Sequence, residues 1–204
     1  MLGDADGRML SEAKFYNPWG VVLHKYSLYI TDQFNHAIKV IKEGHDHVYT
    51  LAQRGLISNP RGITVDKYST KDVAYIACSR VLLRIDLNSR AVIKLTGGTG
   101  PTGSLSASRP SLLYGITFLT ESVLLYPSPR KDQLVVADLA RDKVNYICNG
   151  VPLTQDGSIK TCSFDNPRSV MVMSWSVYIG QNRAIRRLPL KAITDLVRPA
   201  EPIG

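Results

Sequence analysis

The stretch that decides the fold is Asn17–Ile38, NPWGVVLHKYSLYITDQFNHAI. Its apolar residues form two short runs rich in Val, Leu, Ile and Tyr, with Asn-Pro before the first run and Asn-His after the second. Short runs of this kind between turn-forming residues are typical of antiparallel strands. We therefore predict strands at 20–23 and 28–31, with a third strand starting at Ala37.

The same phrase returns three more times along the chain. The prolines that open its copies are Pro18, Pro60, Pro110 and Pro167, which lie 42, 50 and 57 residues apart. A supersecondary unit reused about every 40 to 50 residues is typical of β-propeller blades, which stack on one another to bury their faces. Repetition thus predicts the architecture before any functional motif is considered.

We expect four short antiparallel strands in each unit, as in a propeller blade. The expected strands are 20–23, 28–31, 37–41 and 48–51; 62–65, 73–77, 81–86 and 91–95; 115–118, 133–137 and 143–147; and 169–173, 177–180 and 184–188, with a poorly marked outer strand after these. In the third unit, this assignment places a long insertion after the inner strand. Gly20 and Gly62 open the first two inner strands, where the backbones of neighbouring blades are expected to approach closely.

Helical periodicity is nowhere sustained, so we predict an all-β protein. A single domain is expected over residues 1–204, because domains of about 100 to 200 residues are the norm. Its four blades are expected at about 15–57, 58–107, 108–163 and 164–204.

These units resemble NHL repeats. The likeness covers 15–21, 28–38 and 48–52 of the first unit, is good in the second unit and partial in the third and fourth. WD40 repeats fit less well, because the chain has no Trp-Asp dipeptide. The resemblance implies a β-propeller, usually one with six blades.

Four units are fewer than such a ring needs. An unclosed propeller exposes sheet edges and apolar blade faces. We therefore expect either an incomplete ring or arc, which a missing segment or another chain completes, or a five-bladed variant that uses the chain's tails.

The composition is that of a folded domain with excess positive charge. The chain is 44% hydrophobic and carries 25 Lys and Arg against 17 Asp and Glu, a formal net charge of +8. This excess favours nucleic acid, anionic lipid or an acidic protein as a partner. No apolar stretch approaches the roughly 18 to 20 residues of a membrane helix, so no membrane span is expected. No secretory leader is visible, and an intracellular location is the default expectation.

Cysteine usage does not indicate a disulfide framework. The three cysteines, Cys78, Cys148 and Cys162, have no Cys-x-x-Cys spacing. We expect buried thiols, with a Cys148–Cys162 disulfide as the less favoured alternative in an oxidising compartment.

No catalytic or cofactor motif stands out. The Gly97–Ser104 run lacks the lysine of a phosphate-binding loop, and there is no Gly-x-Ser-x-Gly. The repeat map places His24, His36 and His45 on different turns. It therefore does not support the three-histidine zinc centre of the amidating lyases that resemble NHL propellers. Four aspartates are expected to stabilise turns: Asp32, Asp66, Asp86 and Asp138. We predict no cofactor, no metal and no enzymatic activity.

Arginines recur in loops that should share one end of the disc. In propellers of the kind that the resemblance implies, the loop entering the inner strand and the loop between the second and third strands open at the same end. The predicted partner-binding face therefore consists of Arg61, Arg80, Arg109, Arg141, Arg168, Arg183, Asn35 and His36. Guanidinium groups suit carboxylate or phosphate. A second basic run, 127–132, is expected to project from the opposite face as a solvated loop.

We predict a non-catalytic binding or scaffold module whose arginine-bearing face engages a protein partner. The first alternative is single-stranded RNA, which some NHL propellers of tripartite-motif proteins bind on that face. A metal-dependent lyase or hydrolase is the second alternative. Protein is preferred over RNA because the pattern lacks a dense platform of aromatic residues for base stacking.

Overall fold

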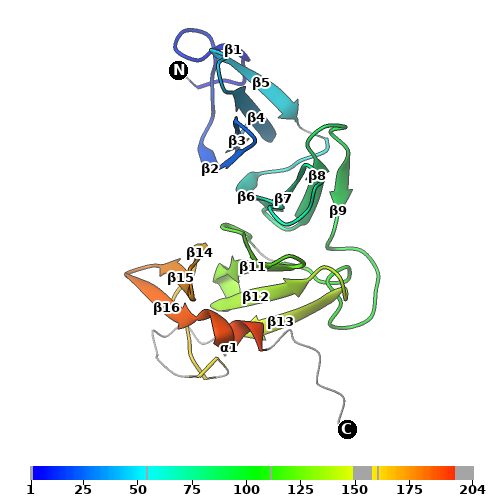
Figure 1. The fold of residues 1–204 in the computed structure, drawn as a ribbon, viewed down its shortest axis with the longest axis vertical. Coiled ribbons are helices and arrows are strands. Elements are labelled where there is room, and N and C mark those ends of the chain that lie inside the picture. Colours follow the sequence, from blue (N-terminus) through cyan, green and yellow to red (C-terminus); the bar gives the residue numbers. More distant parts are fainter. Residues whose placement is uncertain (1, 54, 111, 149–157, 160, 196–204) are drawn as a thin grey trace.

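The computed structural model is all-β and describes residues 2–53, 55–110, 112–148, 158–159 and 161–195. Four antiparallel sheets follow one another along the chain and form the blades of a β-propeller. The blades are arranged as an open arc (Figure 1). The predicted fold class is confirmed.

The first two blades follow the predicted strand order. Blade 1 has the order β1-β5-β4-β3-β2, and blade 2 has the order β6-β7-β8-β9. Their strands are β1 Gly7–Arg8, β2 Pro18–His24, β3 Ser27–Asp32, β4 Ala37–Lys42 and β5 His47–Ala52, then β6 Pro60–Val65, β7 Val73–Cys78, β8 Leu82–Asp86 and β9 Val92–Lys94.

Blades 3 and 4 are built in the same way, with β10-β11-β12-β13 and β14-β15-β16 in order. Their elements are β10 Thr117–Thr120, β11 Val123–Ser128, the 3-10 helix η1 Pro129–Lys131, β12 Gln133–Asp138 and β13 Lys143–Ile147, then β14 Ser169–Met173, β15 Ser176–Gln181, β16 Ala184–Pro189 and α1 Leu190–Thr194. In the described part of the chain, β16 is followed by α1, and the predicted outer strand is not seen there. No helix among these residues is long and apolar enough to cross a membrane.

The strand assignment for blade 3 was wrong in one respect. The predicted long insertion contains β11, which is buried along its whole length and pairs with both β10 and β12. Pro127 lies within β11, and a proline in an apolar run argues against a strand from sequence alone. Because β12 is the third strand and not the second, the loops on either side of it open at the opposite ends from those predicted.

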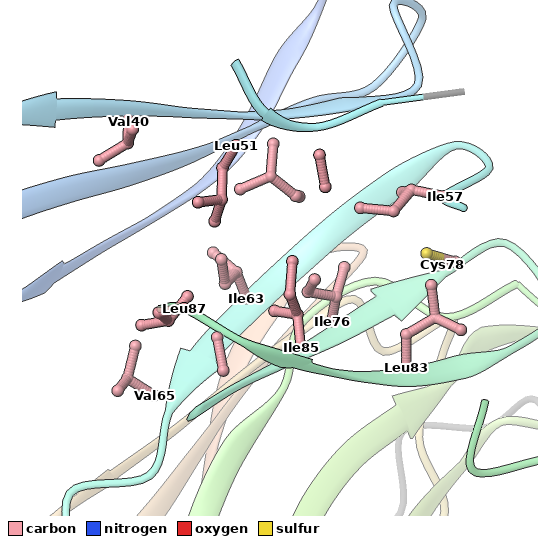
Figure 2. Packing of buried hydrophobic residues seen from close by; sticks show 13 residues of the cluster. Val40, Leu51, Ile57, Ile63, Val65, Ile76, Cys78, Leu83, Ile85 and Leu87 are labelled. Carbon is pink, nitrogen blue, oxygen red and sulfur yellow. The ribbon is translucent and has the colours of Figure 1, made fainter. Parts of the chain in front are cut away.

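The core consists of three apolar clusters, one between each pair of successive blades. Between blades 1 and 2, Val40 and Leu51 face Ile63 and Ile85 (Figure 2). Each blade therefore depends on its neighbour to keep one sheet face out of water.

The two ends of the arc are open, as predicted for an incomplete ring. On the free face of blade 4, Met171 and Met173 are each 52% exposed and Ile185 is 78% exposed. On blade 1, Val21 is 60% and Leu23 is 71% exposed. An isolated apolar side chain on a surface is ordinary, but Met171 and Met173 of β14 share one sheet face with Ile185 of β16, and Val21 and Leu23 are alternate residues of β2.

The N-terminal residues cover the outer part of the free face of blade 1. Lys39 is fully buried there, and its Nζ donates to the Asp6 carboxylate (2.8 Å) and to the Asp4 carbonyl (2.8 Å). Burial raises the pKa of Asp6, but hydrogen bonds from Lys39 and Thr50 outweigh it, so that the pKa lies below its usual value. Because its ammonium group is paired and hydrogen-bonded by the segment that precedes β1, this lysine can be buried.

The predicted crowding at the inner strands is confirmed. A Cβ on Gly20 would overlap the carbonyl oxygen of Arg61, and a Cβ on Gly62 would overlap that of Tyr114. The third inner strand repeats the arrangement, since Gly115 N donates to the Arg168 carbonyl (2.9 Å). Successive inner strands therefore lie so close together that these positions require glycine.

The cysteine prediction was wrong for two of the three residues. Cys148 and Cys162 form a disulfide beside the core of blades 3 and 4. Cys78 is a buried free thiol, and burial raises its pKa to about 12, so it is protonated at neutral pH. The less favoured alternative is therefore the one observed, and the disulfide closes the loop between two cysteines that are 14 residues apart.

We predict that Gly62→Ala lowers the free energy of unfolding by ~1–3 kcal/mol, because the added methyl must push neighbouring inner strands apart. Urea unfolding followed by tryptophan fluorescence measures the change. The matched control is Gly98→Ala, where the new Cβ would meet the Ser106 carbonyl at an ordinary 3.5 Å. Equal effects of the two substitutions would contradict close approach at the axis.

We predict that the unreduced, urea-unfolded protein takes up one iodoacetamide label, and that three are taken up after reduction, as counted by mass spectrometry. Reduction should also destabilise the protein by about 3 kcal/mol, the chain-entropy value for a loop of this size. A variant with both Cys148→Ser and Cys162→Ser should not respond to reductant. Three labels without reductant would show that the disulfide is absent.

Candidate functional site

One position recurs at the start of every inner strand, directly before the glycine or serine. The four residues at this position, from blade 1 to blade 4, are Trp19, Arg61, Tyr114 and Arg168. The residue two places earlier has a positive φ in every copy: Asn17 (58°), Asn59 (46°), Leu112 (52°) and Asn166 (50°). The chain therefore makes the same turn four times and presents a corresponding side chain from each blade.

The turn explains why Asn-Pro recurs in the sequence. Asparagine tolerates the left-handed conformation, and the ring of the proline that follows it fixes the φ of that proline. In blade 3, Leu112 takes the place of the asparagine, although leucine adopts this conformation rarely. The third copy of the phrase is therefore Leu112–Gly115 and not Arg109-Pro110 as the sequence alignment had placed it.

Three of these four side chains gather on the ring of Tyr114. The Cζ atoms of Arg61 and Arg168 lie 4.4 and 5.4 Å from its centroid. The Trp19 ring lies 5.4 Å from that of Tyr114, tilted by 57°. Each cation–π contact contributes about 0.5–1 kcal/mol at an exposed site. We call these four residues the axial cluster.

Two further contacts hold Arg61 in place. Its Nη1 donates to the Leu113 carbonyl (3.4 Å). When the Gln33 amide is turned so that its oxygen faces Arg61, it accepts hydrogen bonds from Nε (3.0 Å) and Nη2 (3.2 Å). The guanidinium is thus positioned before any ligand binds.

The axial cluster has positive charge without a matching negative charge. Neither Arg61 nor Arg168 forms a salt bridge with any of the described residues. Arg168 is exposed and Trp19 is 47% exposed, so the cluster is open to solvent. Two guanidinium groups on one ring repel each other, and an anion between them would relieve that repulsion.

Three more predicted arginines lie at this end of the disc. Arg80 lies between β7 and β8, and Arg183 lies between β15 and β16, each in a loop joining second and third strands. Arg109 lines a small hollow together with Ser128 and Lys131. These side chains share this end of the disc with the axial cluster and are not part of it.

Arg141 lies at the opposite end, which corrects the sequence prediction. It is in the loop between β12 and β13, the third and fourth strands of blade 3. Its Nη1 also donates to the buried carboxylate of Asp138 (2.7 Å). The cause of the error is the unrecognised strand β11.

The basic run 127–132 was predicted to project from the face opposite the arginines, but it lies at the same end of the disc as they do. It contains the end of β11 and η1 and joins the second and third strands, so Arg130 and Lys131 lie at the arginine-bearing end. Asp132 accepts a hydrogen bond from Asn166 N (2.7 Å). His36 does the same for Asn59 N in blade 1 (3.0 Å), which shows that the two loops are equivalent.

Asn35 and His36 have structural contacts at this end. The Asn35 amide donates to the Gly3 carbonyl (2.5 Å) and to Asp32 (2.7 Å), so it ties the N-terminal segment to blade 1. His36 connects blade 1 to the start of blade 2 through Asn59. They support the end of the disc from which the arginines project.

The aspartate prediction is confirmed for the turns. Asp66, Asp86 and Asp138 each accept two backbone N–H bonds from the residues that follow. Asp32 accepts from Tyr16 N and from the Asn35 amide. Across the described ranges, no group of three or more His, Cys, Asp or Glu residues is placed to hold a metal ion.

The partner-binding face predicted from the sequence included neither Trp19 nor Tyr114. The signal was available, because both occupy the position of Arg61 and Arg168 once the copies are aligned on the glycine. Alignment on Pro110 hid this equivalence in the third unit.

Comparison with known proteins supports the fold. No protein-family model and no curated protein matches the sequence, so NHL membership remains a resemblance. Among solved structures, a chain of a nidogen/laminin complex matches with a TM-score of 0.63 and 16% identity, covering 85% of this chain and 60% of that one. Virginiamycin B lyase from Staphylococcus aureus matches with a TM-score of 0.58 and 14% identity, covering 91% and 56%. This chain therefore spans little more than half the length of these propellers, and at such identities the likeness shows the fold alone.

A charged contact between blades 1 and 2 predicts a response to acid. Lys25, His24 and Asn88 hydrogen-bond to Asp72, and they lower its pKa well below the usual range. Because folding lowers this pKa, the contact stabilises the protein fully above the unfolded-state value of about 3.9 and progressively less as the pH falls below it.

We predict that the difference in unfolding free energy between wild type and Asp72→Asn narrows as the pH is lowered from about 5 to about 2. Urea unfolding at each pH measures it. Glu121→Gln, which removes an exposed carboxylate from another turn, is the control for the loss of one negative charge. A difference that stays constant with pH would contradict the lowered pKa.

Proposed function

We propose that this chain is a non-catalytic binding module whose axial cluster engages an acidic segment of a protein partner. The observation that carries the proposal is the pair of guanidinium groups of Arg61 and Arg168 on the Tyr114 ring, with no carboxylate partner in the described part of the chain. Both groups lie where inner strands begin, at the arginine-bearing end of the disc.

The residue types favour a protein ligand. Arginine binds a carboxylate through two parallel N–H bonds, and such charge-assisted bonds are stronger than neutral ones. Trp, Tyr and Arg are also the residues that most often dominate binding energy in protein interfaces. Trp19 and Tyr114 would supply apolar contact beside the charged pair.

The propeller fold is compatible with this proposal and does not decide it. A chain of similar fold occurs in a complex of nidogen and laminin, and another is a lyase. One fold hosts many functions, so function must be argued from the site. The cluster contains groups that bind anions and no nucleophile or general base paired with one, which is why binding is proposed and catalysis is not.

We predict that a fluorescein-labelled oligoglutamate peptide binds the protein at low ionic strength, and that changing both Arg61→Gln and Arg168→Gln weakens this binding about tenfold or more, as measured by fluorescence polarisation. The matched control changes Lys71→Gln and Lys143→Gln, two exposed lysines at the other end of the disc, with the same loss of charge.

Oligouridine RNA of the same length distinguishes the class of partner. Tighter binding of RNA than of oligoglutamate, lost in the double arginine variant, would replace the protein partner with single-stranded RNA. Equal weakening in the arginine and lysine variants would mean that only net charge matters, and it would overturn the proposal.

A further inference from the structure

Two hollows lie between blades 1 and 2, away from the axial cluster. Their volumes are about 410 and 680 Å³. Both lie over the apolar core that joins the two blades, which Figure 2 shows in part. Volumes of this order are typical of sites for small ligands or for the side chains of a peptide.

The first hollow has an apolar floor and a basic rim. The floor is made by Val40, Leu51 and Leu87, each less than a tenth exposed. Its walls carry Tyr29 and Tyr49. The rim carries Lys42, which ends β4, and His45 and Arg90, which lie in the loops between the third and fourth strands of blades 1 and 2.

The second hollow repeats this chemistry. Ile57 and Leu83, which are buried, and Val81 and Val92, which are half-buried, provide apolar surface. Lys94 and His36 are the residues of basic type that line it. Both hollows therefore combine an apolar floor with basic residues.

The outer edges of the two blades differ in length. The outer strand of blade 2, β9, has only three residues, whereas β5 of blade 1 has six and pairs on its outer side with β1.

The charged side chains that line the hollows are all of basic type. Among the described residues, no aspartate or glutamate lines either hollow, and Lys42, Arg90 and Lys94 form no salt bridge. Elsewhere in the chain, by contrast, Lys39 and Arg141 are paired with carboxylates. A ligand that complements these hollows carries apolar groups for the floors and negative charges for the rims.

We infer that the cleft between blades 1 and 2 is a second binding site, which takes an extended peptide segment with alternating apolar and acidic side chains. In an extended segment, alternate side chains point in opposite directions, so one set reaches the floors while the other set stays near the rims and solvent. Extended peptides commonly bind beside exposed strands in this manner, and β9 offers such a strand. The site differs from the axial cluster in position and in its apolar floors.

The test uses a fluorescein-labelled peptide of alternating leucine and aspartate, roughly ten residues long so that it reaches across both hollows. Binding should weaken at least tenfold when Lys42→Glu and Arg90→Glu are combined. The matched control, with Lys71→Glu and Lys143→Glu, has the same net charge and should bind nearly as wild type. Circular dichroism confirms that both variants are folded.

Two further probes separate charge from apolar contact. A peptide of alternating serine and aspartate should bind much more weakly, and so should one of alternating leucine and lysine. Equal binding of the serine peptide, or equal weakening by the two double variants, would overturn the inference.

Hydrogen exchange gives a measurement that does not depend on substitutions. The leucine–aspartate peptide should slow exchange in His47–Ala52 and Val92–Lys94. Protection confined to the entrances of the inner strands would place the peptide at the axial cluster and overturn the inference. The Arg61→Gln, Arg168→Gln variant should retain binding in the cleft, so the two proposals can fail separately.

Discussion

Close approach of successive inner strands is the constraint on which the rest of the structure depends. Gly20 and Gly62 lie against the carbonyls of the next blade, and Thr31 bridges the first two blades through the Gly20 amide (2.7 Å) and the Arg61 carbonyl (2.5 Å). The spacing leaves no room for a Cβ at these glycines. The side chain of the residue just before each glycine lies at the arginine-bearing end of the disc. The axial cluster is a direct consequence of this packing.

The charges of the chain fall into two groups with different roles. Lys39 and Arg141 are bonded to carboxylates that are placed by the local fold, and they stabilise a covered sheet face and a turn. Arg61, Arg168, Lys42 and Arg90 have no carboxylate partner among the described residues. What sets these four cations apart from other exposed basic residues is their place on an aromatic ring or beside an apolar floor, and the proposed acidic ligands would compensate their charge.

Some features of the fold and the site could be predicted from the sequence, whereas others depend on residues far apart in the chain. Periodic apolar runs and the Asn-Pro phrase predicted the blades and the aspartate turns, which depend mainly on residues close in sequence, and the repeat predicted the crowded glycines, which meet the next blade. Arg141 and the 127–132 loop were assigned to the wrong ends, since Pro127 concealed a strand and each missed strand reverses the direction of those that follow. The hollows could not be predicted, because residues from two different blades line them.

The sequence by itself determined the repeat, the all-β class, the turn residues and an excess of basic side chains, since all of these follow from local preferences and composition. Only the tertiary structure decided which cations share a ring, which are neutralised and which face an apolar cleft. Tyr114 lies 53 positions after Arg61 and 54 before Arg168. Aligning the repeats on the glycine shows that these residues are equivalent, but whether their side chains touch depends on how one blade packs against the next.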